Sequence, residues 1–222
     1  MPYKSELKYA ENPKGWNKEG DVFSRLEILN LVYGLYANNK DIILAAGVSD
    51  DDELNKVREL LKKGKSVIIT QPDEEVYEDL RKKLKDYPKA KIIKDYTFNI
   101  GKYLPEKSLD YAILLNIINW IPTKLLEMLK GLTKVLKSDG YVIISFYVHL
   151  NPNAPEIKYI IDTPKEFLNL VDKLGKFIAY YSDKNGILAC YVIDARNLNR
   201  LYKEVEGKYR ELEREIRFYH SN

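Results

Sequence analysis

Hydrophobic positions along the chain follow two patterns, short apolar runs and helix-like spacings. The apolar runs are rich in Ile, Val and Leu and are too short for helices. Runs of this kind are typical of parallel strands that are buried on both faces of a sheet. They occupy residues 41–47, 65–72, 90–96, 108–117 and 141–148.

The segments between these runs place apolar residues three or four positions apart, as in amphipathic helices. The pattern predicts helices over residues 50–64, 73–88 and 123–140, and a helix at 21–38 before the first strand. The first of these helices ends at Gly64, and Ser49 or Asp50 is suited to cap its start. Strands that alternate with helices predict an α/β fold with a doubly wound, mostly parallel sheet.

The last third of the chain has a different pattern. A helix is expected at 163–175, and two β-rich runs over 176–194 flank Asn185-Gly186, which is a strong hairpin signal. The sheet is therefore expected to have seven strands and to end in an antiparallel hairpin. We expect one domain over residues 1–222, made of an N-terminal arm and helix (1–40), a core (41–193) and a long C-terminal helix (195–220).

The expected C-terminal helix has an apolar stripe with nearly heptad spacing. Its members are Leu201, Val205, Tyr209, Leu212, Ile216 and Tyr219. Such a stripe is not expected to remain in water, so the helix packs on its own domain, pairs in a homodimer, or contacts another partner. Gly207 weakens a free-standing helix and favours packing.

Composition restricts the function classes. The formal net charge of +3 is too small and too evenly spread to indicate nucleic-acid or membrane binding. No apolar run is long enough to span a membrane, the polar N-terminus lacks a signal peptide, and the single cysteine, Cys190, excludes an internal disulfide. We therefore expect a cytoplasmic protein. Abundant Lys and Glu with little Met, His or Cys suggest the hypothesis of a thermophilic source.

Five stretches together resemble the class I S-adenosylmethionine-dependent methyltransferases over residues 41–193. The stretches are IILAAGVS, VIITQPD, IIKDYTF, SLDYAILLNIINWIP and LTKVLKSDGYVIIS, in the family's order and with its spacing. The resemblance implies a Rossmann-like methyltransferase fold, S-adenosylmethionine as cofactor and a methyl acceptor that is a small molecule. It does not identify that acceptor.

The resemblance also implies cofactor-binding positions at the first strand. Ala45, Ala46 and Gly47 stand in the family's glycine loop, where small residues let the backbone approach the methionine part of the cofactor. Ile43 stands where the family often has an acid, so one polar anchor is missing. The structural alternative is a strand-to-helix turn without a ligand, with the acids at 50–53 serving as a helix cap.

The ends of the next three strands supply the other expected contacts. By resemblance, Gln71 or Asp73 meets the ribose, Asp95 meets the adenine amino group, and Tyr96 flanks the ring. Asn116 stands where the methyl group meets its acceptor. Each also has a structural alternative, because Gln71 and Asp95 are common turn residues and Asn116 could bond to backbone.

Two functions of different classes therefore compete. The leading hypothesis is a divergent methyltransferase with residues 1–40, including Tyr33 and Tyr36, as a lid over the pocket. The alternative is a cofactor-free interaction module, motivated by the changes at Ile43, Ala45 and Gln71. Nucleic-acid modification, suggested by the stretches KKGK and RKKLK, is less favoured because such charges usually form solvated faces. We identify no general base and expect no metal site.

Overall fold

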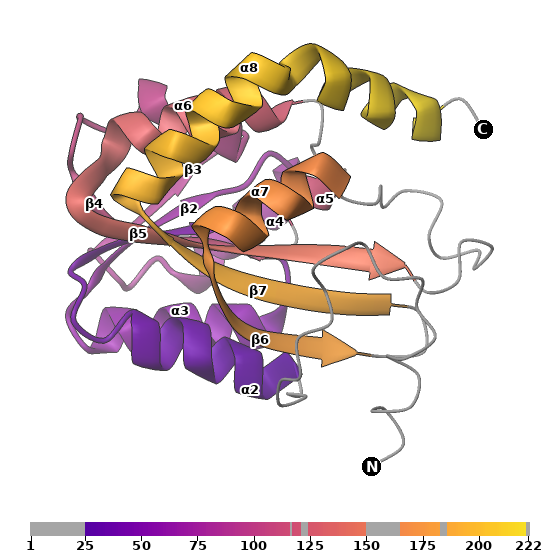
Figure 1. Cartoon of the computed structure of the whole chain (residues 1–222). Coiled ribbons are helices and arrows are strands. Elements are labelled where there is room, and N and C mark those ends of the chain that lie inside the picture. Colours follow the sequence, from indigo (N-terminus) through magenta and orange to yellow (C-terminus); the bar gives the residue numbers. More distant parts are fainter. Residues whose placement is uncertain (1–24, 116, 121–123, 150–164, 183–185, 221–222) are drawn as a thin grey trace.

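The computed structural model describes residues 25–115, 117–120, 124–149, 165–182 and 186–220 (Figure 1). Seven strands form one sheet in the order β3-β2-β1-β4-β5-β7-β6. The strands are β1 Ile42–Ala46, β2 Ser66–Thr70, β3 Ala90–Ile93, β4 Leu109–Leu114, β5 Leu136–His149, β6 Lys176–Ser182 and β7 Gly186–Asp194. The first five are parallel, and β7 is antiparallel to both β5 and β6. The predicted seven-stranded sheet with its closing hairpin is confirmed.

Helices cover both faces of this sheet (Figure 1). One face carries α2 Arg25–Leu29, the π-helix η1 Asn30–Tyr36, α3 Asp51–Lys62 and α4 Glu74–Lys83. The other carries the 3-10 helix η2 Thr97–Lys102, α6 Leu125–Val135, α7 Lys165–Leu174 and α8 Ala195–His220, and the short α5 Ile117–Trp120 follows β4. Successive residues of β1 alternate between the two cores, since Ile43 and Ala45 belong to one and Leu44 and Ala46 to the other. The fold is therefore doubly wound, as predicted.

The helix boundaries follow from local caps. Asp50 precedes α3, and its Oδ1 accepts a hydrogen bond of 3.0 Å from the Glu53 N–H. Asp73 caps α4 in the same way through Val76. Gly64, with φ of +80°, ends α3 in the left-handed conformation that favours glycine. The predicted helix over 123–140 is shorter, because α6 ends at Val135 and Leu136 starts β5.

The predicted helix before the first strand is confirmed from Arg25, but its second half is a π-helix. Two tyrosine hydroxyls from the sheet meet carbonyls of this wider helix. Tyr111 donates to the Val32 carbonyl over 3.0 Å, and Tyr141 donates to the Tyr36 carbonyl. Burial raises the pKa of Tyr111 well above its usual value, which keeps its hydroxyl a donor.

The expected lid is wrong for the described part of residues 1–40. Tyr33 is 3% exposed and belongs to the core under the sheet. Tyr36 packs edge-on against Tyr141, near the amino end of β1. The apolar spacing of the segment is explained by this burial.

The first half of α8 packs on its own domain. Leu198, Leu201 and Val205 are fully buried in the core that also includes α6 and α7. The expected packing of the helix on its own domain is therefore confirmed for this half. The side chains of Tyr209, Leu212 and Ile216 lie outside the described part of the structure. Within the described residues, no helix is long and apolar enough to cross a membrane.

Candidate cofactor site

The loop after β1 lies where strand order reverses, because β1 pairs with β2 on one side and β4 on the other. Ligands of open α/β sheets bind outside the carboxyl ends of strands at such a point. Gly47 stands at the tip of β1 with φ of +67°, a left-handed conformation. Its N–H donates to the Thr70 carbonyl at the end of β2 over 2.9 Å. The backbone turn of a glycine loop is thus present.

The other small residues of the loop lie within the strand rather than at its tip. Ala45 is fully buried in the core shared with α3, and Ala46 is 5% exposed in the opposite core. Ile43, at the position of the family's acid, is also fully buried. Ile43 thus contributes to the core between the sheet and α3.

The side chain of Ile117, from the start of α5, lies over Gly47. A Cβ placed on Gly47 would be 2.5 Å from Cδ1 of Ile117, the first residue of α5. The Ile117 side chain therefore lies in contact with the glycine. The sequence did not predict this contact, because the spacing of hydrophobic residues along the chain does not indicate which side chain packs against Gly47. Asn116, the preceding residue, lies outside the described residues.

The Gln71 side chain connects the loops that follow β1 and β2. It is 5% exposed, its Nε2 donates to the Val48 carbonyl over 3.1 Å, and its Oε1 accepts from the Asp73 N–H over 3.1 Å. Each amide atom has the capacity for a second hydrogen bond. Gln71 therefore has a structural role, and its ribose contact stays a prediction.

Beside it, the end of β2 is also joined to the segment after β3. The hydroxyls of Thr70 and Thr97 share a buried hydrogen bond of 2.7 Å. This bond holds η2, which begins at Thr97, against the carboxyl end of β2. The two segments expected to meet the ribose and the adenine are thereby fixed relative to each other.

Asp95 follows β3 and accepts three hydrogen bonds from its own neighbourhood. Oδ1 accepts from the Tyr96 N–H at 2.7 Å and from Asn99 at 2.9 Å, and Oδ2 accepts from the Tyr103 hydroxyl at 2.7 Å. Burial raises the pKa of Asp95, but the bonds from Asn99, Tyr103 and the Tyr96 N–H outweigh it and hold the pKa below its usual value. Asp95 is therefore ionised at neutral pH and available as an acceptor.

An aromatic surface lies next to this carboxylate. The Tyr96 ring stacks on Phe98 with centroids 5.0 Å apart and planes 12° apart, and Tyr96 remains 45% exposed. Lys124 places its Nζ 5.8 Å from the Phe98 ring centroid. The exposed Tyr96 ring is the kind of surface on which a flat ligand stacks, and the contacts of Asp95 and Tyr96 with adenine stay a prediction.

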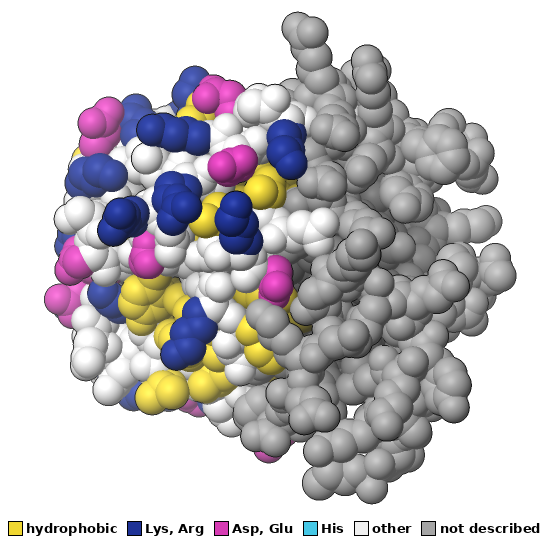
Figure 2. Space-filling model, in the orientation of Figure 1, with side chains coloured by type: hydrophobic (Ala, Val, Ile, Leu, Met, Phe, Trp, Pro, Cys, Tyr) yellow, Lys and Arg dark blue, Asp and Glu magenta, His cyan; other side chains and the backbone are white. Residues whose placement is uncertain are grey.

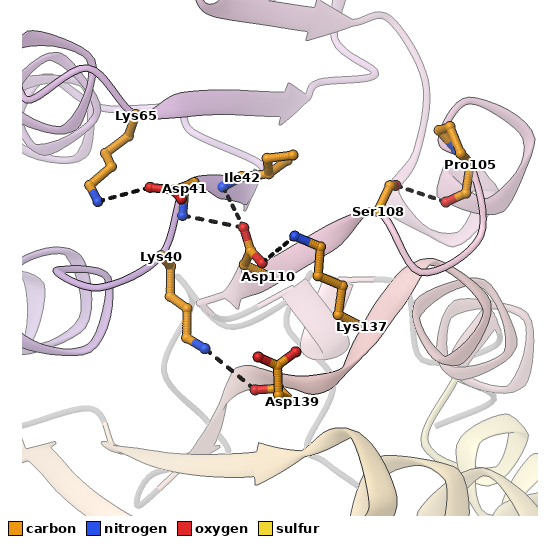
Figure 3. A network of polar contacts seen from close by, with 9 residues as sticks. All are labelled: Lys40, Asp41, Ile42, Lys65, Pro105, Ser108, Asp110, Lys137 and Asp139. Carbon is orange, nitrogen blue, oxygen red and sulfur yellow. Dashed lines mark hydrogen bonds and ion pairs between the residues drawn. The ribbon is translucent and has the colours of Figure 1, made fainter.

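The opposite, amino ends of the strands are joined by Asp110 (Figure 3). Its Oδ2 accepts from the N–H groups of Ile42 at 2.9 Å and Asp41 at 3.2 Å, and its Oδ1 accepts from Lys137 at 2.6 Å. These contacts connect the starts of β1, β4 and β5. A shallow hollow of about 350 Å³ lies elsewhere, between the end of α4 and edge strand β3, and includes none of the predicted site residues.

The sequence matches no known family model, and no curated protein was found to match it. Its structure is similar to that of a SAM-dependent methyltransferase from Aquifex aeolicus, with a TM-score of 0.55, 16% identity and coverage of 87% of this chain and 94% of that one. It also resembles the N-terminal domain of EvdMO1 with SAH bound, with a TM-score of 0.57, 11% identity and coverage of 88% and 98%.

A third similar structure is the PH0226 protein from Pyrococcus horikoshii OT3, with a TM-score of 0.54, 16% identity and coverage of 75% and 88%. These similarities extend over most of the chain and are too low in identity to show more than the fold. Together with the strand order, they show that this chain has the class I methyltransferase fold.

Proposed function

We propose that the protein binds S-adenosylmethionine at the carboxyl ends of β1, β2 and β3 and transfers its methyl group to a small-molecule acceptor. The observation that carries the proposal is Gly47, which holds a left-handed turn at the tip of β1 in this strand order. The N-terminal domain of EvdMO1, a similar structure, has SAH bound, which supports this class of ligand. We assign the methionine part to the Gly47 turn, the ribose to Gln71, and the adenine to Asp95 and Tyr96.

The residues present fit this ligand in part. Asp95 is an ionised acceptor beside an exposed aromatic ring, and Gly47 has no Cβ in the way of the backbone. When bound, the cofactor supplies an electrophilic methyl group on a sulfonium, which passes to a lone pair of the acceptor as the carbon–sulfur bond breaks. The acceptor's proton is released to solvent. Alignment of the two reactants supplies much of the rate in such a displacement, so the proposal needs no general base.

A second candidate is the cofactor-free interaction module. It is favoured by Ile117, which contacts the glycine turn, and by Gln71, whose amide bonds to two loop backbones. Nucleic-acid modification has no such support on the face seen in Figure 2, where Lys and Arg side chains are interleaved with Asp and Glu.

Calorimetric titration of S-adenosylmethionine and S-adenosylhomocysteine into wild type and Ile117→Ala separates the two candidates. Ile117 must move for the methionine part to reach Gly47, so the proposal expects both proteins to bind and the variant to bind more tightly. Ile178→Ala, a half-buried isoleucine in β6, is the matched control and should bind as wild type does. Absence of heat and of a thermal shift in both wild type and Ile117→Ala at millimolar ligand overturns the methyltransferase proposal.

A further inference from the structure

The strand order leaves β3 at one edge of the sheet, where its backbone pairs on one side only. The Gln71 N–H donates to the Ile93 carbonyl over 3.0 Å. The Val67 N–H donates to the Lys89 carbonyl, also over 3.0 Å. In a parallel pair, every second residue of a strand bonds to a given neighbour. Residues 89, 91 and 93 therefore face β2, and the N–H and carbonyl of Ile92 face the open edge.

The shallow hollow of about 350 Å³ lies directly beside this open edge. Its lining combines apolar side chains, among them Leu84, Tyr87 and Ile92, with the cations Arg81 and Lys85. A hollow this shallow would leave a small molecule mostly in water, since ligand pockets bury most of the ligand's surface. An extended chain gains backbone hydrogen bonds along a strand edge and needs only shallow pockets for alternate side chains. The hollow and the edge together therefore suit a peptide.

Basic residues gather around the edge, and they are Arg81, Lys85, Lys91 and Lys94. The Arg81 guanidinium carbon and the Lys94 Nζ lie 5.7 and 5.9 Å from the centroid of one ring, that of Tyr77. Arg81 pairs with Glu78, and Lys94 pairs with Glu74. Lys85 and Lys91 are exposed, and neither forms an ion pair with another residue of the described ranges. These two charges are available to an acidic partner.

The lysines also argue against a second β3 strand as the partner. If two copies of β3 paired in an antiparallel manner at Ile92, the two Lys91 side chains would become diagonal neighbours on one face. Lysines on an edge strand disfavour such edge-to-edge pairing of identical chains. A segment with carboxylates meets the same charges favourably.

We propose that an extended acidic segment of another protein adds to the open edge of β3 as a further strand. An apolar residue at its centre exchanges both backbone hydrogen bonds with Ile92, and its side chain lies beside that of Ile92 over the hollow. Acidic residues two positions before and after it share this face, one toward Lys85 and the other toward Lys94. The inference is independent of the proposed function, because it uses none of the side chains assigned to the cofactor.

A labelled peptide of sequence Thr-Glu-Thr-Val-Thr-Glu-Thr is the probe, and fluorescence anisotropy measures its binding to the wild-type protein. N-methylation of the central valine removes the donor to the Ile92 carbonyl and changes no side chain. The methylated peptide should bind about tenfold more weakly. Equal binding of the two peptides, or no binding of the probe at millimolar protein, overturns the proposal.

A charge reversal tests the basic side of the edge. Lys85→Glu replaces an attraction by a repulsion and should weaken binding of the probe by about fivefold. Lys82→Glu makes the same change at an exposed position of α4 outside the lining of the hollow, so it is the matched control and should bind as wild type does. An equal loss in both variants means a general effect of net charge and contradicts the site.

Amide hydrogen exchange locates the added strand. The Ile92 N–H faces the open edge in the free protein and should exchange more slowly when the probe is bound, whereas the N–H of Ile93, which faces β2, should be unchanged. Slower exchange at another strand and not at Ile92 overturns the proposal. A dimer seen by light scattering that the probe dissociates would also overturn it, because a second copy of the chain would then occupy the edge.

Discussion

At both ends of the parallel strands, polar side chains bond to the protein's own backbone and side chains. Only at the carboxyl end do the same residues also stand at a predicted ligand site. At the amino end, Asp110 bonds to the backbone of β1 and to Lys137 (Figure 3). At the carboxyl end, Gln71 and Asp95 also bond to their own chain, although we propose both as cofactor contacts. The type of a residue and its position in the fold therefore indicate which hydrogen bonds it can make. They do not indicate whether its partner is the protein itself or a ligand.

The largest difference is expected from removing one carboxylate at each end. Asp110→Ala leaves the Asp41 and Ile42 N–H groups and Lys137 without their acceptor, and should reduce the free energy of unfolding by about 2–3 kcal/mol. Asp95→Ala should cost about 1 kcal/mol or less, because exposed Tyr103 can bond to water instead. Urea unfolding measures both values.

Equal losses in the two variants would show that the carboxyl end is as much a structural device as the amino end. That outcome would favour the interaction module. Asp139→Ala is the control, because the substitution keeps the backbone carbonyl that accepts from Lys40 and removes only a charge near Lys137, so stability should be nearly unchanged.

The next largest effect concerns Gln71. Gln71→Glu removes the donor to the Val48 carbonyl and places a carboxylate beside that carbonyl at a buried position, which should cost about 1–3 kcal/mol of stability. If the ribose binds here, the same change should tighten cofactor binding, because charge-assisted bonds to hydroxyls are stronger. Calorimetry and urea unfolding on one sample separate the two effects.

Gln71→Met is the matched control, since it nearly keeps the volume and removes both side-chain hydrogen bonds. It should lose stability without any gain in affinity. If the Gln71→Glu variant binds the cofactor no more tightly than Gln71→Met, the role of Gln71 is limited to joining the loops after β1 and β2.

A smaller effect is expected from acid. Burial raises the pKa of Asp110, but the hydrogen bonds from Lys137 and the Ile42 N–H lower it by more. The pKa of Asp110 therefore lies below the ordinary value of 3.8. A carboxyl with a lowered folded pKa stabilises the protein above its unfolded pKa and loses that contribution as pH falls through the folded pKa. The stability difference between wild type and Asp110→Asn should thus be constant above about pH 5 and shrink below about pH 4.

Local signals and distant contacts account for what the sequence did and did not predict. The Asp50 cap and the end of α3 at Gly64 were predictable, since each depends on residues within one helical turn. The π-helix was not, because it is matched to hydroxyls of Tyr111 and Tyr141, far away in the chain. The contact of Ile117 with Gly47 was missed for the same reason, because it joins the turn after β1 to the start of α5.

The variant with the smallest expected effect on stability, Asp73→Asn, tests whether Asp73 contacts the ribose of the cofactor. Asp73 caps α4 through Oδ1, and asparagine caps as well as aspartate, so Asp73→Asn should change stability by only a few tenths of a kcal/mol. If Asp73 rather than Gln71 accepts the ribose hydroxyls, the variant loses a charge-assisted bond and cofactor binding should weaken by about tenfold. Asp50→Asn, the same change at the cap of α3, is the control. Unchanged affinity in Asp73→Asn assigns Asp73 to the cap alone and leaves Gln71 as the ribose contact to be tested.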